Sequence, residues 1–126
     1  MSTGTAELPP ITEYHLVDKV GERVIHAHLL GHASSWKPTK LRWFEVSLYK
    51  TAAGEYVVHT LGKSKVEGDV TRARIADTSS SWDVMELLTV THRGETYIPR
   101  DSLRALAQAA QWDIDLRARY LEVSQP

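Results

Sequence analysis

The order of the local signals along the chain predicts an α+β fold: an antiparallel β-meander of about four to five strands with C-terminal helices packed on one face. β-prone runs occupy residues 13–75, and helical patterns begin only at Ser79. Nothing between the first four strands can form a crossover helix, which disfavours a parallel sheet. The length of 126 residues fits a single α+β domain, residues 11–126, after a flexible N-terminal lead-in, residues 1–10.

The strands are predicted from β-prone runs that end at glycine or at clusters of small polar residues. The strongest signal is the hairpin of residues 41–61, in which two such runs flank a loop that ends at Gly54. An earlier hairpin turns near Gly21. In chain order we expect strands at residues 13–19, 23–30, 41–50, 55–66 and 70–75, with a connecting loop at residues 31–38.

The first helical pattern follows the serines at positions 79–81, which are good N-cap residues. Trp82 and Met85 fall on one face of this helix. Its end is ambiguous, because residues 88–91 and 96–98 can also pair as a small hairpin.

The clearest helix is predicted to open with Asp101 as its N-cap. Its apolar stripe consists of Leu103, Leu106, Ala107 and Ala110. After a break near Asp113, the stripe is extended by Ile114, Leu116, Tyr120 and Leu121. We expect this stripe to cover the aliphatic face of the sheet.

The pairing within the hairpin of residues 41–61 decides which side chains share a face. If the loop is Thr51–Gly54, Lys50 lies opposite Glu55. One face then carries the pairs Leu48–Val57, Val46–His59 and Phe44–Leu61. The other face is aromatic and lightly polar, with Trp43, Tyr49 and Tyr56. We interpret the second face as a binding surface, because a solvated face carries more charge.

In the first hairpin, Asp18 opposite Arg23 places four potential metal ligands on the open face of the sheet. These are His15, His26, His28 and Glu13. Histidines at positions i and i+2 of a strand project in the same direction, and imidazole nitrogens bind zinc. One alternative function is therefore a small metal- or histidine-dependent enzyme with Zn as its cofactor.

Composition limits the remaining classes. The net charge is −1, but residues 36–75 carry eight basic against four acidic side chains, and residues 76–126 carry five against eight. This asymmetry can steer an anionic partner. No apolar run reaches the length of about 20 residues that spans a bilayer, so we expect no membrane partner. The absence of cysteine fits a cytoplasmic location.

The residue types favour a small non-enzymatic binding or adaptor module. Tyr, Trp and Arg anchor protein interfaces, so a protein partner or a homo-oligomer is expected, with a nucleoprotein assembly as one setting. The predicted binding surface consists of Trp43, Tyr49, Tyr56, Lys40, Arg42, Lys63, Lys65, Arg72 and Arg74. The same surface suits an alternative function, the binding of single-stranded nucleic acid, because aromatic rings stack on bases while Lys and Arg contact phosphates.

Overall fold

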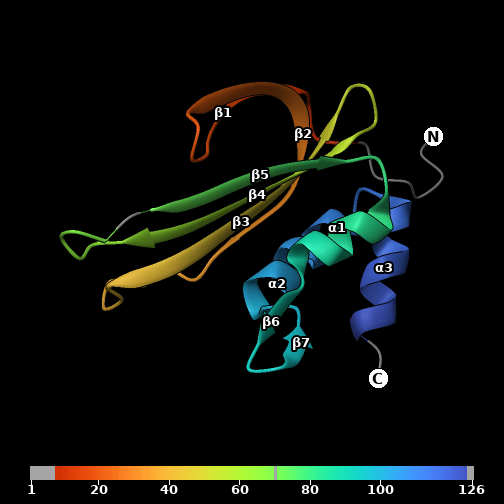
Figure 1. Ribbon diagram of the computed structural model, residues 1–126. Helices are drawn as coiled ribbons and strands as arrows, with labels where there is room; N and C mark the ends of the chain where they lie inside the picture. Colours follow the sequence, from red (N-terminus) through yellow and green to blue (C-terminus); the bar gives the residue numbers. More distant parts are fainter. Residues whose placement is uncertain (1–7, 70, 125–126) are drawn as a thin grey trace.

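The computed structural model describes residues 8–69 and 71–124 and confirms the α+β class (Figure 1). Five strands form one antiparallel sheet in chain order, namely β1 (Thr12–Val17), β2 (Glu22–Ser34), β3 (Arg42–Thr51), β4 (Tyr56–Ser64) and β5 (Arg72–Thr78). The remaining elements are α1 (Ser81–Leu88), the hairpin of β6 (Val90–His92) and β7 (Glu95–Tyr97), α2 (Arg100–Ala109) and α3 (Ile114–Ser124). Most of the predicted lead-in, residues 1–7, lies outside the described residues.

β2 is longer than predicted, because it continues through Gly31 to Ser34 where the sequence suggests a loop. Its first half pairs with β1 and its second half pairs with β3. A bulge at Leu30 interrupts the second pairing, since Leu29 lies opposite Tyr49 and Gly31 lies opposite Leu48. The extra residue reverses the alternation of side chains, so the two halves of β2 face opposite sides of the sheet.

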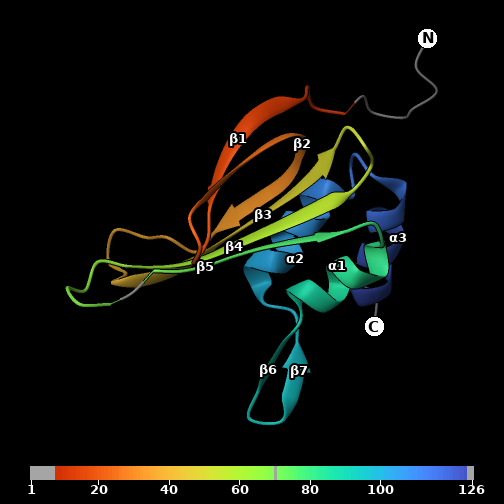
Figure 2. The same ribbon diagram turned by 45° about the horizontal axis from the view of Figure 1, so that its top comes forward.

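This reversal gives the molecule two hydrophobic cores. The larger core lies between the sheet and the helices and is built from side chains such as Leu30, Leu48 and Leu106. The smaller core lies on the opposite face, where the β1–β2 hairpin curls over the sheet, and includes Leu16 and Ile25 (Figure 2). The chain itself therefore covers both faces of the central strands.

The predicted pairing of the β3–β4 hairpin is wrong by one residue. Lys50 pairs with Tyr56, and Glu55 belongs to the turn, where its carbonyl accepts from the Thr51 amide at 2.8 Å. Gly54 adopts a φ of +88°, a conformation that favours glycine, and so closes a turn that is one residue longer than expected. The added residue exchanges the two faces of β4 relative to β3.

The predicted pairing of the first hairpin is shifted by two residues. Glu13 lies opposite His26 instead of His28, and His15 lies opposite Val24. Because side chains alternate with a period of two, this shift leaves the predicted faces intact. The turn is tightened by the Asp18 carboxylate, which accepts from two backbone amides.

The helices begin close to where the sequence places them. Ser80 caps α1 by accepting from the amide of Trp82 at 3.2 Å. The prediction that Asp101 is the N-cap of α2 is wrong: the cap is Pro99, and Asp101 lies in the first turn. The proline ring fixes φ close to the value of −57° seen here, so this residue is suited to start the helix. The ambiguous segment after α1 forms the small β6–β7 hairpin.

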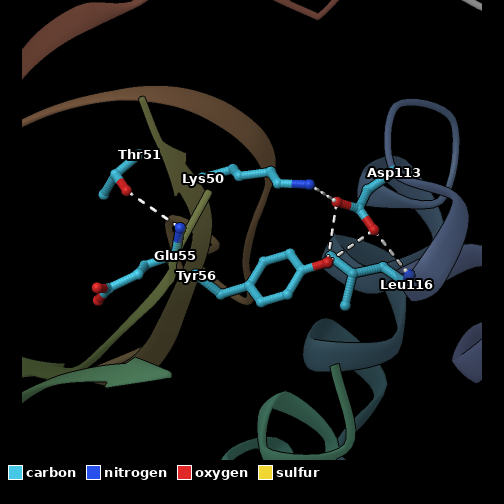
Figure 3. Close-up of polar contacts among 6 residues, drawn as sticks. All are labelled: Lys50, Thr51, Glu55, Tyr56, Asp113 and Leu116. Carbon is cyan, nitrogen blue, oxygen red and sulfur yellow. Dashed lines mark hydrogen bonds and ion pairs between the residues drawn. The ribbon is translucent and has the colours of Figure 1, made fainter. Parts of the chain in front are cut away.

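The predicted break near Asp113 is confirmed and separates α2 from α3. The side chain of Asp113 joins α3 to the sheet (Figure 3). The Asp113 carboxylate accepts from Lys50 Nζ at 2.7 Å and from the Tyr56 hydroxyl at 2.9 Å. It also accepts from the amide of Leu116 at 2.9 Å, which satisfies one of the free amides at the start of α3. One buried carboxylate thus joins two strands to the helix.

Among the described residues, no helix is both long and apolar enough to cross a membrane.

Candidate interaction surface

The structure separates the three aromatic residues of the predicted surface. Tyr49 and Tyr56 are only 5% and 4% exposed, and they belong to different cores on opposite faces of the sheet. The Tyr49 ring packs on Tyr14 of the curled hairpin, with ring centroids 4.9 Å apart. The predicted exposed aromatic face is therefore wrong, because the one-residue change in pairing turns Tyr56 towards the helices and the β1–β2 hairpin covers Tyr49.

Most of the predicted basic residues instead lie at one end of the sheet. There β3 begins, β4 ends and β5 begins, and the three strands extend past the helices (Figure 1). In this region Phe44 pairs with Gly62, and Gly62 pairs with Arg72. These three positions therefore form a row across the sheet, with a residue that lacks a side chain at its centre. We call this region, built from residues 42–44, 60–64 and 72–74, the basic sheet end.

Two adjoining hollows lie on the basic sheet end, and both include Gly62 and Arg72 in their walls. The first, of about 460 Å³, is lined by Lys19, Phe44, Thr60, Gly62, Arg72, Ala73 and Arg74. The second, of about 410 Å³, is lined by Arg42, Trp43, Gly62, Lys63, Ser64, Gly68, Asp69 and Arg72. Five basic residues and one acidic residue line the two hollows together, and Lys63 among them directs its side chain to the other face of the sheet.

Three of these basic side chains are available to a partner. Within residues 8–69 and 71–124, no carboxylate oxygen lies within 4.0 Å of the charged groups of Lys19, Arg72 or Arg74. All three residues are exposed. Their charges are therefore unneutralised at short range, and this end of the molecule presents a positive potential.

Arg42 has a structural partner. Its Nε lies 2.7 Å from an oxygen of Asp69, and the Ser64 hydroxyl donates to the same oxygen at 2.7 Å. The hydrogen bond from Arg42, followed by that from Ser64, lowers the pKa of Asp69 below its usual value. This ion pair fastens the β4–β5 turn to β3 and keeps the carboxylate ionised at neutral pH.

Trp43 and Lys63 share Glu45 as a partner on the other face of the sheet. The Trp43 indole donates to the Glu45 carboxylate at 2.8 Å, and Lys63 Nζ lies 3.6 Å from the same oxygen. Trp43 is half-buried, so its ring is held in place and is only partly accessible.

The last two predicted basic residues, Lys40 and Lys65, lie near the loop that carries Trp36. Lys65 Nζ is 5.6 Å from the centroid of the Trp36 ring, and the Lys65 amide donates to the carbonyl of Leu41. Lys40 lines a separate pocket beside α2. The structure thus brings Trp43, Arg42, Lys63, Arg72 and Arg74 together and leaves Lys40 and Lys65 at the border of this group.

The histidine cluster has a different organisation from a metal centre. His15 contacts two carboxylates, with Nε2 2.8 Å from Glu13 and Nδ1 2.9 Å from Glu22. His26 Nε2 lies 3.3 Å from Glu13, while His28 Nδ1 bonds to a backbone carbonyl. The hydrogen bonds that the His15 ring makes to the carboxylates of Glu13 and then Glu22 raise the pKa of His15. Both ring nitrogens of His15 are thus within hydrogen-bond distance of a carboxylate.

Among the described residues, no group of three or more His, Cys, Asp or Glu side chains is placed to hold a metal ion. Zinc binding by Glu13, His15, His26 and His28 therefore stays a prediction from the sequence alone.

Sequence reasoning missed three residues that line the first hollow, namely Lys19, Phe44 and Gly62. Lys19 reaches this region only because the first hairpin curls over the sheet, and no local pattern encodes that curl. Phe44 was assigned to the core, but it lies at the border of the helix-covered region and is half-buried. Gly62 did carry a usable signal, since a glycine inside a strand often marks a position where another group approaches the backbone.

Comparison with known proteins adds no functional assignment, since no family model, no curated protein and no solved structure matches the chain.

Proposed function

We propose that the protein is a non-enzymatic binding module that docks an acidic protein partner on the basic sheet end. The observation that carries this proposal is the pair of hollows over Gly62, lined by five basic residues and one acidic residue, with Lys19, Arg72 and Arg74 exposed and without a carboxylate within 4.0 Å among the described residues. The absence of cysteine supports a cytoplasmic setting for this module.

The shape of the surface supports a partner that inserts side chains into it. Gly62 leaves a depression between Phe44 and Arg72, and the exposed part of the Phe44 ring offers apolar contact at its edge. Interfaces combine apolar anchors with charged groups at the rim. An Asp or Glu side chain that enters the depression can accept hydrogen bonds from Arg72 and Arg74, in pairs that are stronger than those between neutral groups.

A protein partner is favoured over single-stranded nucleic acid because the aromatic platform is absent. Binding of single strands uses successive rings on which bases stack. Tyr49 and Tyr56 are in the cores, and the half-buried Trp43 is bonded to Glu45. One partly accessible ring does not provide a run of stacking positions, whereas basic side chains around a hollow suit an acidic side chain.

The test compares capture of proteins from the native host by the wild-type chain and by R72E/R74E, in lysate treated with nuclease. Both side chains are exposed and have no carboxylate within 4.0 Å among the described residues, so the variant should keep the wild-type stability. The control is R117E, an exposed arginine on α3 that does not line the basic sheet end; because its Nε donates to the carbonyl of Ala110 at 2.8 Å, the unfolding free energy of R117E is measured alongside its capture. We expect a defined protein to be retained by the wild type and by R117E and lost from R72E/R74E.

Two outcomes contradict this proposal. Equal capture by the wild type and R72E/R74E would remove the basic sheet end from the interaction. Capture that disappears on nuclease treatment, together with a mobility shift of a 20-nucleotide oligo-dT strand, would favour the nucleic-acid alternative, whose affinity should fall steeply with salt.

For the zinc alternative, elemental analysis of the purified protein decides, because a bound metal would be present in stoichiometric amount.

A further inference from the structure

A second basic pocket, separate from the basic sheet end, lies between the end of β2, the loop that follows it and the start of α2. Its volume is about 380 Å³, and its walls contain Lys37, Lys40, Arg100 and Arg104 against a single carboxylate, Asp101. This volume lies within the range of pockets that hold small molecules. The positive charge is contributed by two segments about 60 residues apart in the chain, which the fold brings together.

The charges of this pocket are mostly uncompensated. Asp101 lies 3.2 Å from Arg104 and neutralises that side chain. Within the described ranges, no carboxylate oxygen lies within 4.0 Å of Lys37, Lys40 or Arg100. Like charges that share one concave site repel one another, and a bound anion relieves this repulsion. The excess of positive charge suits a group that carries two negative charges better than a single carboxylate.

Two serine hydroxyls complete the donor set. The Ser34 oxygen accepts from the Trp36 amide at 3.1 Å, and the Ser35 oxygen accepts from the Phe44 amide at 2.8 Å. Each hydroxyl also has one proton to donate, and these backbone bonds leave that proton free. Both residues line the pocket. Hydroxyl and ammonium donors around one cavity are the groups that surround a phosphoryl group in proteins.

The pocket also offers a surface for an organic moiety. Trp36 forms part of its wall and is 48% exposed. Indole presents an apolar face on which planar groups stack. A ligand with a phosphoryl group at one end and a flat ring at the other satisfies both parts of the pocket.

We propose that this pocket binds a small phosphomonoester, with the phosphoryl group held by Lys37, Lys40 and Arg100 and the organic part against Trp36. The site is independent of the proposed function, because Lys37, Arg100 and Trp36 do not line either hollow of the basic sheet end. A module of this kind can bind a small ligand at one site while it docks a protein at the other.

The test uses adenosine 5′-monophosphate as the probe, with adenosine and inorganic phosphate as its two halves. We expect saturable binding of the monophosphate by calorimetry, with amide shifts in an NMR titration centred on Trp36, Lys37 and Arg100. Adenosine should bind at least about tenfold more weakly, because it lacks the charged group. Inorganic phosphate should compete for the same amide shifts.

Two variants distinguish binding in this pocket from a general attraction of anions by the net charge of the protein. K37Q/R100Q removes two of the exposed charges and should weaken the monophosphate by about tenfold or more. The control R72Q/R74Q removes the same amount of charge from the basic sheet end and should leave the affinity unchanged. R72E/R74E tests the proposed function separately, so either result can fail without the other.

Three results overturn the proposal. Equal affinity for adenosine and its monophosphate would show that the phosphoryl group makes no contact. Equal weakening by K37Q/R100Q and R72Q/R74Q would mean that only the net charge matters. Binding of a phosphoserine peptide, without binding of the monophosphate or inorganic phosphate at millimolar concentration, would assign the pocket to a protein ligand.

Discussion

Among single residues, Asp113 has the largest structural role in joining the helices to the sheet. Its side chain is 1% exposed, and burial by itself raises the pKa of a carboxyl group. Here the hydrogen bonds from Lys50, the amide of Leu116 and Tyr56, with the charge of Lys50, outweigh burial, so the pKa of Asp113 is lowered overall. Burial and the neighbouring carboxylate raise the pKa of Tyr56, which keeps the phenol neutral and able to donate.

Replacement of Asp113 by alanine should therefore be strongly destabilising. D113A leaves the buried Tyr56 hydroxyl and the Lys50 ammonium without their partner and removes the cap of α3. Loss of one member of a buried, hydrogen-bonded charge pair costs about 3–5 kcal/mol. The free energy of unfolding in urea measures this loss. The control is D115A, which removes an exposed acid from the same helix turn and should cost less than about 1 kcal/mol.

The contribution of Asp113 should depend on pH with a definite sign. Because its folded pKa is lowered, the stabilisation is fully present above the unfolded pKa, which is about 3.9. It is lost as the pH falls through the lower, folded value. The difference in unfolding free energy between the wild type and D113N should thus be constant from pH 5 to 7 and decrease below pH 4. A difference that grows towards acid would contradict an ionised Asp113.

The contribution of His15 to stability should have the opposite pH dependence to that of Asp113. Its hydrogen bonds to Glu13 and then to Glu22 raise its pKa, so its stabilising contacts are present below the unfolded value of about 6.5. They are lost as the pH rises through the folded value. An NMR titration of the imidazole signals should give a lower pKa for His15 in E13Q/E22Q than in the wild type. An unchanged value would show that the two carboxylates do not contact the ring in solution.

At the scale of paired elements, the backbones of β2 and α2 approach each other closely at Gly31. A Cβ built at Gly31 lies 2.1 Å from the carbonyl oxygen of Ala105, so no side chain fits there without displacement of the helix. Backbone atoms cannot rotate away as the end of a side chain can. A glycine at this position therefore lets α2 lie directly on β2.

G31A should accordingly destabilise the protein by about 3 kcal/mol, the upper part of the usual cost of overpacking. Thermal or urea unfolding gives the value. The matched control is G62A, another glycine within a strand, where a Cβ lies 3.7 Å from the Cβ of Arg72 in an ordinary contact. If the two variants are equally stable, the packing of α2 on β2 is looser than described.

The curled β1–β2 hairpin is fixed by its core more than by its ion pair. Arg23 and Asp77 form two hydrogen bonds of 2.5 Å between β2 and β5, but their side chains are 42% and 36% exposed. Surface pairs of this kind contribute about 0–1 kcal/mol. Ile25 is 5% exposed in the smaller core, and truncation of such a side chain to alanine costs about 2–5 kcal/mol. In urea unfolding, R23A should therefore lose far less stability than I25A. The reverse order would show that the Arg23–Asp77 ion pair, and not the smaller core, holds the β1–β2 hairpin against the sheet.

Features of the fold that depend on neighbouring residues could be predicted from the sequence, whereas features that depend on distant residues could not. The order of strands and helices follows from local patterns, and the break at Asp113 follows from its neighbours. The register of the β3–β4 hairpin could not be predicted, because a loop that ends at Gly54 closes equally well with or without Glu55. One residue in the turn decided whether Tyr56 lies beside Tyr49 or on the other face, and with it the interpretation of the aromatic surface.

The curl of the sheet needs information from distant parts of the chain. The bulge at Leu30 and the contact of the His59 ring with the carbonyl of Val17 join residues that no sequence window contains together. The basic residues of the candidate site were predictable from composition, because residues 36–75 hold the positive excess. Their gathering at one end of the sheet was not, since it depends on how β3, β4 and β5 pair.

For the whole molecule, charge and shape at the basic sheet end can be separated by experiment. The exposed Arg72 and Arg74 attract an acidic partner through charges that salt screens over about 8–10 Å at ionic strengths of about 0.1–0.15 M. The depression over Gly62 acts only on contact. G62L, whose Cβ would make only an ordinary contact with the Cβ of Arg72 at 3.7 Å, should fill the depression with no change in charge.

Association rates of the captured partner, measured from 50 to 500 mM NaCl, should therefore respond differently in two variants. R72Q/R74Q should lower the rate at low salt and flatten its salt dependence, because steering by exposed charge is a rate effect. G62L should leave the salt dependence as in the wild type and accelerate dissociation, because it removes the fit of the docked complex. If G62L binds as tightly as the wild type, the partner contacts the charges but does not enter the hollow, and the interface must then lie along the strand edges of the basic sheet end.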